Sequence, residues 1–206
     1  IELEMQNDEL RCGQQILEES RNRYQELYDF APIGYLTLDG YSAITEDNLT
    51  AAELFGMTRK DLLQQRFSHL VGCEDREQWF REFTQTMKQG DPRSFDVSCL
   101  RADGSRFYGR LACLRMEPGG EATQMRIVLS DITEQWLARQ HLAELIASSM
   151  DAMISVDGEE RIRLFNPAAE RMFGMAADLA LGQPLDTLLP ETYCHFHKIH
   201  QDAHRQ

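Results

Sequence analysis

Positive charge is scarce in this chain. The 206 residues include 21 Lys and Arg against 34 Asp and Glu, so the formal net charge is −13. Nucleic acids and anionic membranes are bound by clustered Lys and Arg, so neither is expected as a partner. The sequence also lacks an apolar run of about eighteen residues and a basic leader followed by an apolar stretch. We therefore expect neither a membrane span nor a signal peptide in this segment.

Cysteine is sparse, and the motifs of common enzymes are missing. The five cysteines are Cys12, Cys73, Cys99, Cys113 and Cys194. Their odd number, without any Cys-x-x-Cys pair, indicates free thiols in a reducing cytoplasm. The sequence has no phosphate-binding Gly-x-x-x-x-Gly-Lys loop, Gly-x-Ser-x-Gly elbow or His-Glu-x-x-His zinc motif, so we expect no enzyme activity in this segment.

What the chain does contain is an internal repeat. The stretch NLTAAELFGM at residues 48–57 recurs 118 positions later as NPAAERMFGM at residues 166–175. The same offset, without a gap, aligns Leu38-Asp39-Gly40 with Val156-Asp157-Gly158 and Leu70-Val71 with Leu188-Leu189. A period this long indicates two tandem copies of a whole domain.

Each copy has the same local signals. A short strand ends in Asp-Gly, which is typical of a turn, and a second strand ends in Asn, which favours the start of a helix. The short helix that follows is expected to end at Gly56 or Gly174, because glycine readily adopts the left-handed conformation.

These features resemble PAS domains, a family of small sensory modules. The resemblance rests on the Asp-Gly turn, the helix from Asn to Phe-Gly, and Asp131-Ile132-Thr133-Glu134 at the end of the first copy. It covers about residues 28–206. It implies an α+β fold, with a five-stranded antiparallel sheet, short helices on one face and long flanking helices. It also implies that Asp131, Ile132 and Thr133 relay a signal to the helix that follows.

We predict four segments along the chain. They are an N-terminal amphipathic or coiled-coil helix at 1–29, a first PAS domain at 30–133, a connecting helix at 134–149, and the N-terminal part of a second PAS domain at 150–206. In the first copy, strands are expected at 34–38, 42–48, 94–101, 106–116 and 123–130, with a loop at 68–72 and a helix at 74–88. The second copy has no counterpart to the last three strands. Because the chain also begins without Met, we expect a piece of a longer protein whose second copy is incomplete here, or is completed by another chain.

The N-terminal segment has the spacing of a weak coiled-coil seam. Leu3, Leu10, Leu17 and Tyr24 recur every seven residues, with Leu27 completing the last heptad. This favours a helix that dimerises or docks, and the alternative is an amphipathic helix packed on its own domain. A homodimer through this helix and the connecting helix is the expected assembly. The connecting helix either transmits a shift or acts as a rigid spacer.

The helix at 74–88 is expected to bury one aromatic face, formed by Trp79, Phe80, Phe83 and Met87. The pocket candidates in the first copy are Phe67, Trp79, Phe83, Phe95, Cys99 and Leu111. Two interpretations stay open. The residues surround a small ligand, or they fill the core of a ligand-free dimerisation and spacer module.

The second copy resembles oxygen-sensing haem PAS domains, and this resemblance makes His197 the candidate iron ligand. His197, His200 and His204 would share one helix face and are the candidate ligands of another metal. The alternative is that these histidines are solvated or belong to a core. Photoreactive flavin domains have Asn-Cys-Arg-Phe where this chain has Gln65-Arg66-Phe67, so a cysteinyl adduct is not expected, although noncovalent flavin stays open. No cofactor is expected in the first copy.

The function expected from these features is a sensory and dimerisation module of a bacterial-type signalling protein. The effector would lie C-terminal to the segment and be a histidine kinase or a diguanylate cyclase. The alternatives are a ligand-free spacer and a haem-based gas sensor that uses the second copy.

Overall fold

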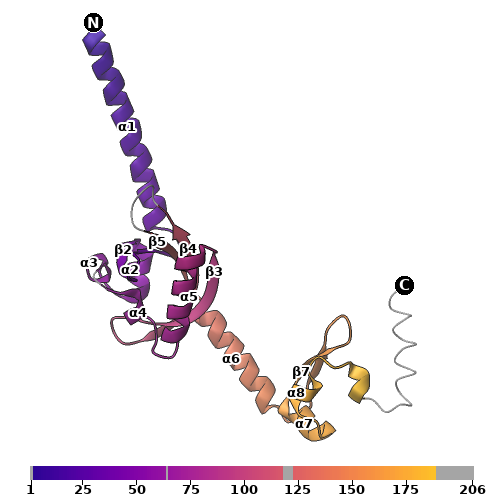
Figure 1. Cartoon of the computed structure of the whole chain (residues 1–206). Helices are drawn as coiled ribbons and strands as arrows, with labels where there is room; N and C mark the ends of the chain where they lie inside the picture. Colours follow the sequence, from indigo (N-terminus) through magenta and orange to yellow (C-terminus); the bar gives the residue numbers. More distant parts are fainter. Residues whose placement is uncertain (1, 64, 118–122, 189–206) are drawn as a thin grey trace, which may run out of the picture. The chain divides into compact units, whose positions relative to one another are not determined.

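The computed structural model describes residues 2–63, 65–117 and 123–188 of the chain (Figure 1). The chain divides into two compact units, Ile1–Glu134 and Gln135–Gln206. The helix face expected to carry His197, His200 and His204 lies outside the described residues.

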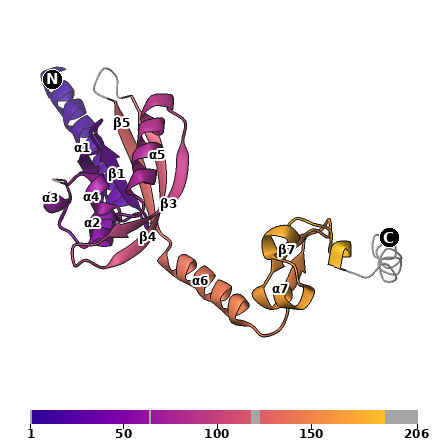
Figure 2. The same ribbon diagram turned by 60° about the horizontal axis from the view of Figure 1, so that its bottom comes forward.

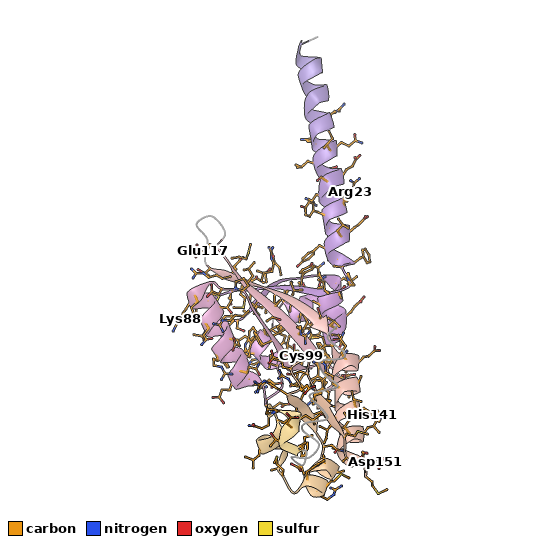
Figure 3. The ribbon with its side chains drawn as sticks, turned by 90° about the vertical axis from the view of Figure 1, so that its right-hand side faces the viewer. Arg23, Lys88, Cys99, Glu117, His141 and Asp151 are labelled. Atoms are coloured by element: carbon orange, nitrogen blue, oxygen red, sulfur yellow. The ribbon has the colours of Figure 1, made fainter. Side chains whose placement is uncertain are left out.

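Helix α1 (Glu2–Asp29) opens the first unit. Every residue from Gly13 to Leu27 is exposed, including the seam residues Leu17 and Tyr24, at 71% and 77%. Figure 3 shows side chains of this helix around Arg23 projecting into open space, whereas those around Cys99 are crowded. This stretch of α1 therefore does not pack on its own domain.

The first unit is built on a five-stranded antiparallel sheet, as predicted for an α+β fold. The strands are β1 (Gly34–Leu38), β2 (Ile44–Asp47), β3 (Arg93–Leu100), β4 (Arg106–Met116) and β5 (Gln124–Asp131). Their order across the sheet is β2-β1-β5-β4-β3. The first and last strands are therefore neighbours, with Leu36 paired to Ile127.

One face of this sheet is buried by helices. Along β4, Phe107, Leu111 and Cys113 are buried while Arg110 and Ala112 are exposed, which is the alternation expected of a strand with one covered face. The covering helices are α2 (Leu49–Phe55), α3 (Arg59–Leu62), α4 (Phe67–Leu70) and α5 (Arg76–Gln89), seen in Figure 2. The core of the first unit lies between these helices and the sheet.

The predicted starts and ends of the two motif helices are confirmed. The side chain of Asn48 accepts a hydrogen bond from the backbone of Ala51 at the start of α2, and Gly56 ends the helix at φ 63°. In the second unit, Asn166 caps α7 (Pro167–Phe173) in the same way, and Gly174 ends it at φ 65°. These caps satisfy backbone groups that have no partner inside the helix.

The Asp-Gly turns form, although not through glycine. Ser42, at φ 66°, is the left-handed residue of the first turn. The carboxylate of Asp39 accepts hydrogen bonds from the backbone of Tyr41 and Ala43, both at 2.8 Å. The aspartate therefore organises the turn by bonding to the backbone after it.

Two helix predictions in the first copy were wrong. The expected loop at 68–72 contains most of α4, whose apolar residues Phe67 and Leu70, three positions apart, are both buried. In α5, Phe80 is 54% exposed, although it was expected to be buried. The buried face consists of Trp79, Phe83 and Thr86, which turns Phe80 toward solvent.

Helix α6 (Thr133–Ser148) leads from the end of β5 into the second unit. The other elements of that unit are β6 (Ile154–Val156), β7 (Ile162–Phe165), α7, α8 (Ala177–Ala180) and a 3₁₀ turn, η1 (Leu185–Leu188). The two strands pair antiparallel. Among the described residues, a small core forms around Ile162, Phe165, Ala169 and Ala180.

Candidate relay site at the end of the first sheet

Arg101 joins three parts of the first unit. It follows β3, and its guanidinium donates to the carboxylate of Asp131 at 3.2 Å and to the backbone carbonyl of Leu54 at 3.2 Å. The guanidinium also lies 4.6 Å from the centre of the Phe107 ring, a cation–π distance. Arg101 thus connects the last turn of α2, an aromatic ring of the core and the end of β5.

Asp131 and Thr133 organise the start of α6. The Asp131 carboxylate accepts a hydrogen bond from the Thr133 backbone at 2.8 Å and another from the Thr133 hydroxyl. The hydroxyl oxygen in turn accepts the backbone N–H of Tyr108 at 2.9 Å, which ties the helix start to β4. A carboxylate here also complements the positive end of the helix dipole.

Ile132 completes the site. Its side chain is 6% exposed, and its backbone N–H donates to the carbonyl of Tyr108 at 2.8 Å. The structure therefore brings together the three residues proposed from the sequence, Asp131, Ile132 and Thr133. Sequence reasoning missed Arg101 and Tyr108. Tyr108 takes part through its backbone, which leaves no signal in the sequence. The only sequence feature of Arg101 was its position just before a hairpin turn, and this does not indicate a contact with Asp131.

The six pocket candidates of the first copy belong to one core region. The ring centres lie 4.6 Å apart for Phe67 and Trp79, 5.4 Å for Trp79 and Phe83, and 6.3 Å for Trp79 and Phe95. Cys99 and Leu111 are fully buried beside them. These side chains pack against one another, an arrangement that favours core filling, and a role in ligand binding stays a prediction.

The buried thiols of the first unit, Cys99 and Cys113, lie in an environment that disfavours the thiolate form. Burial raises the pKa of Cys99 to about 12, and burial likewise raises the pKa of Cys113 to about 12. Both are therefore protonated at neutral pH, and a protonated thiol is a poor nucleophile. Cys73 is exposed, and its thiol donates to the Glu74 carboxylate at 3.1 Å.

The metal and haem hypotheses are not tested by the described residues. Within them, no group of three or more His, Cys, Asp and Glu side chains could hold a metal ion. The three candidate histidines lie outside this part of the chain, so their roles stay predictions. No helix in the described part is both long and apolar enough to cross a membrane.

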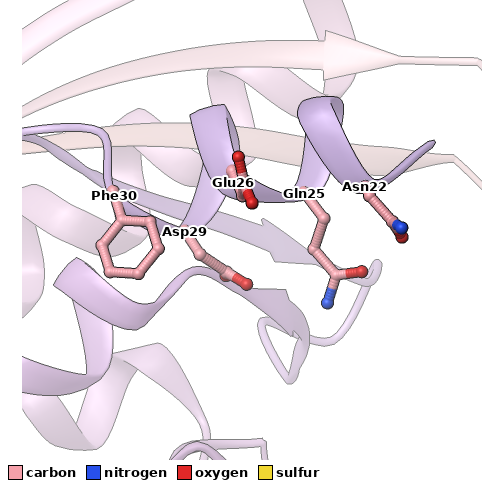
Figure 4. Close-up of a pocket in the computed structure, with 5 residues that line it drawn as sticks. All are labelled: Asn22, Gln25, Glu26, Asp29 and Phe30. Atoms are coloured by element: carbon pink, nitrogen blue, oxygen red, sulfur yellow. The ribbon is translucent and has the colours of Figure 1, made fainter. Parts of the chain in front are cut away.

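Two open pockets flank the end of α1. One, of about 300 Å³, is mainly polar and lined by Asn22, Gln25, Glu26, Asp29 and Phe30 (Figure 4). The other, of about 440 Å³, is mainly apolar and lined by Arg23, Glu26, Leu27, Phe30, Ala31 and Pro32. Neither encloses a ligand-sized space away from solvent, as small-molecule sites do.

Comparison with known proteins identifies the fold and the family. A family model described as "PAS domain" matches residues 32–134, and a second, described as "PAS fold", matches residues 140–206. The chain belongs to the PAS family. Its two PAS domains lie in tandem, and PAS domains are sensory modules of signalling proteins.

Two curated relatives carry similar PAS regions. The chain is 32% identical over 129 residues to Sensor protein FixL of Bradyrhizobium diazoefficiens, covering 57% of this chain and 25% of FixL. It is 26% identical over 127 residues to the probable diguanylate cyclase DgcE of Escherichia coli, covering 58% of this chain and 12% of that protein. The chain thus spans at most a quarter of the length of these relatives.

Solved structures support the fold. The PAS domain of an HTR-like protein from Haloarcula marismortui has a TM-score of 0.53 at 21% identity, covering 59% of this chain and 99% of that one. An RNA-binding light-oxygen-voltage receptor has a TM-score of 0.53 at 17% identity, covering 61% of this chain and 36% of that one. At these identities the similarity concerns the fold alone.

Proposed function

We propose that this tandem PAS segment senses a signal in the first PAS core and relays it through Asp131, Ile132 and Thr133 into α6. The observation that carries the proposal is the position of Arg101. It contacts Phe107 in the core and also binds Asp131, whose carboxylate holds the first residue of α6.

The relay is proposed to work by shifting the balance between two arrangements of the α6 start. A ligand, redox or partner event that moves Phe107 changes the contact with Arg101, and thereby the ion pair with Asp131. Because Asp131 binds both the backbone and the hydroxyl of Thr133, the start of α6 responds. Such a device needs no chemical step in the segment itself.

Hydrogen exchange of the first turn of α6 tests this relay. Arg101→Met removes the ion pair and the bond to Leu54, so amides around residues 131–137 should exchange about five- to tenfold faster. The matched control is Arg110→Met, which removes the exposed ion pair with Asp96 on the open sheet face. Equal exchange rates at residues 131–137 in the two variants would contradict the proposed relay.

The segment is proposed to act within a homodimer formed through α1. The exposed seam residues Leu17, Tyr24 and Leu27 lie on a helix that does not pack on its own domain from residue 13 to residue 27. Their heptad spacing suits a second copy of the same helix. In this proposal the second copy also covers the apolar pocket beside Leu27 and Phe30.

Sedimentation velocity tests the dimer. Leu17→Glu places a charge in the seam and should convert a wild-type dimer to a monomer. Asn22→Glu adds the same charge on the side of the helix opposite Tyr24, so the mass should not change. A wild-type monomer, or a Leu17→Glu dimer, would contradict the proposed seam.

The parent protein is proposed to carry an effector, either a histidine kinase or a diguanylate cyclase. The second is supported by the similarity to a probable diguanylate cyclase. A ligand-free spacer is the second candidate function, supported by the packed rings of Phe67, Trp79 and Phe83. A haem-based sensor using His197 is the third candidate, supported by the resemblance of the second copy to haem PAS domains.

A visible absorption spectrum of the purified protein, extended to include the strands that the second copy lacks here, separates the cofactor hypotheses. A Soret band that is lost in His197→Ala would identify haem at that residue, and flavin bands would place a flavin in the protein. A colourless protein in both forms would exclude both cofactors and leave a colourless ligand or the spacer. Mass spectrometry of copurifying molecules then distinguishes these two.

A further inference from the structure

The buried side chain of Asn48 connects α1 to the first PAS domain. Its amide nitrogen donates to the carbonyl of Tyr28 at 2.8 Å and to that of Ile33 at 3.0 Å. Its amide oxygen accepts the backbone N–H of Tyr35 at 2.8 Å and that of Ala51 at 3.0 Å. The side chain is fully buried and uses both donors and two acceptor positions.

Asn166 makes the same four hydrogen bonds in the second unit. Its amide nitrogen donates to the carbonyl of Ile146 at 3.1 Å and to that of Asp151 at 3.0 Å. Its oxygen accepts the backbone N–H of Met153 at 2.8 Å and that of Ala169 at 3.0 Å. Every partner lies 118 residues after its counterpart in the first unit. The repeat therefore reproduces a complete hydrogen-bond arrangement, of which the helix cap is only one part.

The donated bonds meet a need at the ends of α1 and α6. The last four carbonyls of a helix have no partner within it, and Tyr28 and Ile146 lie in the last turns of these helices. Neither last turn contains a basic residue, and neither helix is followed by glycine, since Phe30 and Ser149 come next. An asparagine from the following domain supplies the missing donor in both places.

We propose that Asn48 and Asn166 are equivalent junction residues, each fastening the end of an incoming helix to the first strand and first helix of the PAS domain that follows. One amide group contacts all three elements, so a displacement of the helix end is passed to the strand and helix together. For the second junction, the direction of signalling rests on the proposed relay through α6. The mechanical link itself does not depend on that relay.

The first junction is held by two further interactions, a hydrogen bond and an ion pair. The hydroxyl of Thr50 donates to the carbonyl of Ala31 at 2.7 Å, and Arg59 pairs with the carboxylate of Asp29 at 3.3 Å. The corresponding positions, 118 residues later, hold Ala168 and Ala177, which cannot make these bonds. The second junction therefore depends more heavily on its asparagine, which makes it the looser of the two.

Replacing asparagine by aspartate separates the junction from the helix cap. A carboxylate still accepts the two N–H groups but has no donor at neutral pH, so both donated bonds are lost, the one to the incoming helix and the one to the segment between that helix and the first strand. In Asn166→Asp, amides in the last turn of α6, residues 145–148, should exchange about tenfold faster, while those at the start of α7 change less than about twofold. Asn166→Ala should speed exchange in both places.

The first unit supplies the matched comparison. Asn48→Asp alone should speed exchange in the last turn of α1 less than Asn166→Asp does in α6, because Thr50 and Arg59 remain. Adding Thr50→Ala should increase the effect while α2 stays protected. If Asn166→Asp unfolds the small second unit, this pair of variants decides the question, because the first unit has a larger core of its own.

Two results would contradict the proposed junction role of Asn48 and Asn166. One is wild-type exchange at the end of α6 in Asn166→Asp together with faster exchange of α7 in Asn166→Ala, which would make Asn166 a helix cap only. The other is an end of α1 that does not respond to Asn48→Asp with Thr50→Ala. Failure of the relay would appear separately, in the Arg101→Met measurement at the start of α6.

Discussion

Trp79 and Phe67 lie with their ring centres 4.6 Å apart at the centre of the first PAS core. Trp79 also contacts Phe83 and Phe95, and no part of its side chain reaches solvent. Its indole N–H has no hydrogen-bond partner among the residues that the structure describes. The residue therefore acts through the apolar surface it buries, and this makes it a sensitive probe of the core.

Trp79→Ala should destabilise the first PAS domain by about 3–5 kcal/mol, because removal of the ring leaves a cavity. The adjacent Phe80 is more than half exposed, so Phe80→Ala should change the free energy of unfolding by less than about 0.5 kcal/mol. Urea denaturation of the two variants checks this. Similar losses would mean that the helix face is assigned wrongly.

Gly56→Ala should destabilise the protein by about 1 kcal/mol. Gly56 ends α2 at φ 63°, a conformation that a Cβ atom disfavours. Gly40 has no positive φ and nothing within 4 Å of an added Cβ, so Gly40→Ala should be nearly neutral. Thermal unfolding compares the two. A larger cost at Gly40 would restore glycine as the key residue of the Asp39 turn.

Stability should fall in alkaline solution. Burial raises the pKa of Cys99 and Cys113 from the ordinary 9.0 to about 12 in the folded protein. As pH rises, the unfolded chain loses these protons first, so stability that is fully present below pH 9.0 declines toward about pH 12. Each thiol contributes at most about 1.4 kcal/mol per pH unit.

Urea denaturation at about pH 8 and about pH 10.5 measures this decline. Cys99→Ala should reduce the pH dependence of the free energy of unfolding, whatever its effect at neutral pH. Cys73→Ala removes an exposed thiol and should leave the wild-type dependence. An unchanged dependence in Cys99→Ala would show that its thiol ionises alike in the folded and unfolded states.

Thiol labelling should also distinguish these cysteines. The experiment uses a Cys12→Ser, Cys194→Ser background. Cys73 should react with a disulfide reagent at neutral pH, whereas Cys99 and Cys113 should react only when the domain unfolds. Peptide mapping of the labelled protein identifies the sites. Labelling of Cys99 at the rate of Cys73 would indicate that the first core opens readily.

The features predicted well from sequence depend on neighbours along the chain. Asn48 starts α2 and Gly56 ends it, and both do so through hydrogen bonds to residues only a few positions away. The residue types alone were therefore enough to predict the two ends of the helix. The resemblance to PAS domains implied a sheet with helices on one face, and the burial pattern along β4 agrees with it. The phase of α5 was harder, because Trp79 and Phe80 are both aromatic and only the position of the sheet determines which one is buried.

The candidate relay site was only partly predictable from the sequence. The resemblance to PAS domains indicated Asp131, Ile132 and Thr133. Arg101 joins them because β3, β4 and β5 pair in a register that brings the turn after β3 to the end of β5. That register depends on many contacts across the sheet, and a single arginine before a turn does not reveal it.

The sequence alone determined that the chain contains two copies of one domain and that each copy has a helix starting at an asparagine. Those caps arise from local bonds, to Ala51 and to Ala169. Only the tertiary structure decided the acceptors of each amide nitrogen, which donates to the carbonyl of Tyr28 or of Ile146, twenty residues earlier in each case. The reason is that each carbonyl belongs to an earlier helix, so its distance from the amide depends on the path of the chain between that helix and the first strand, which no local sequence pattern specifies.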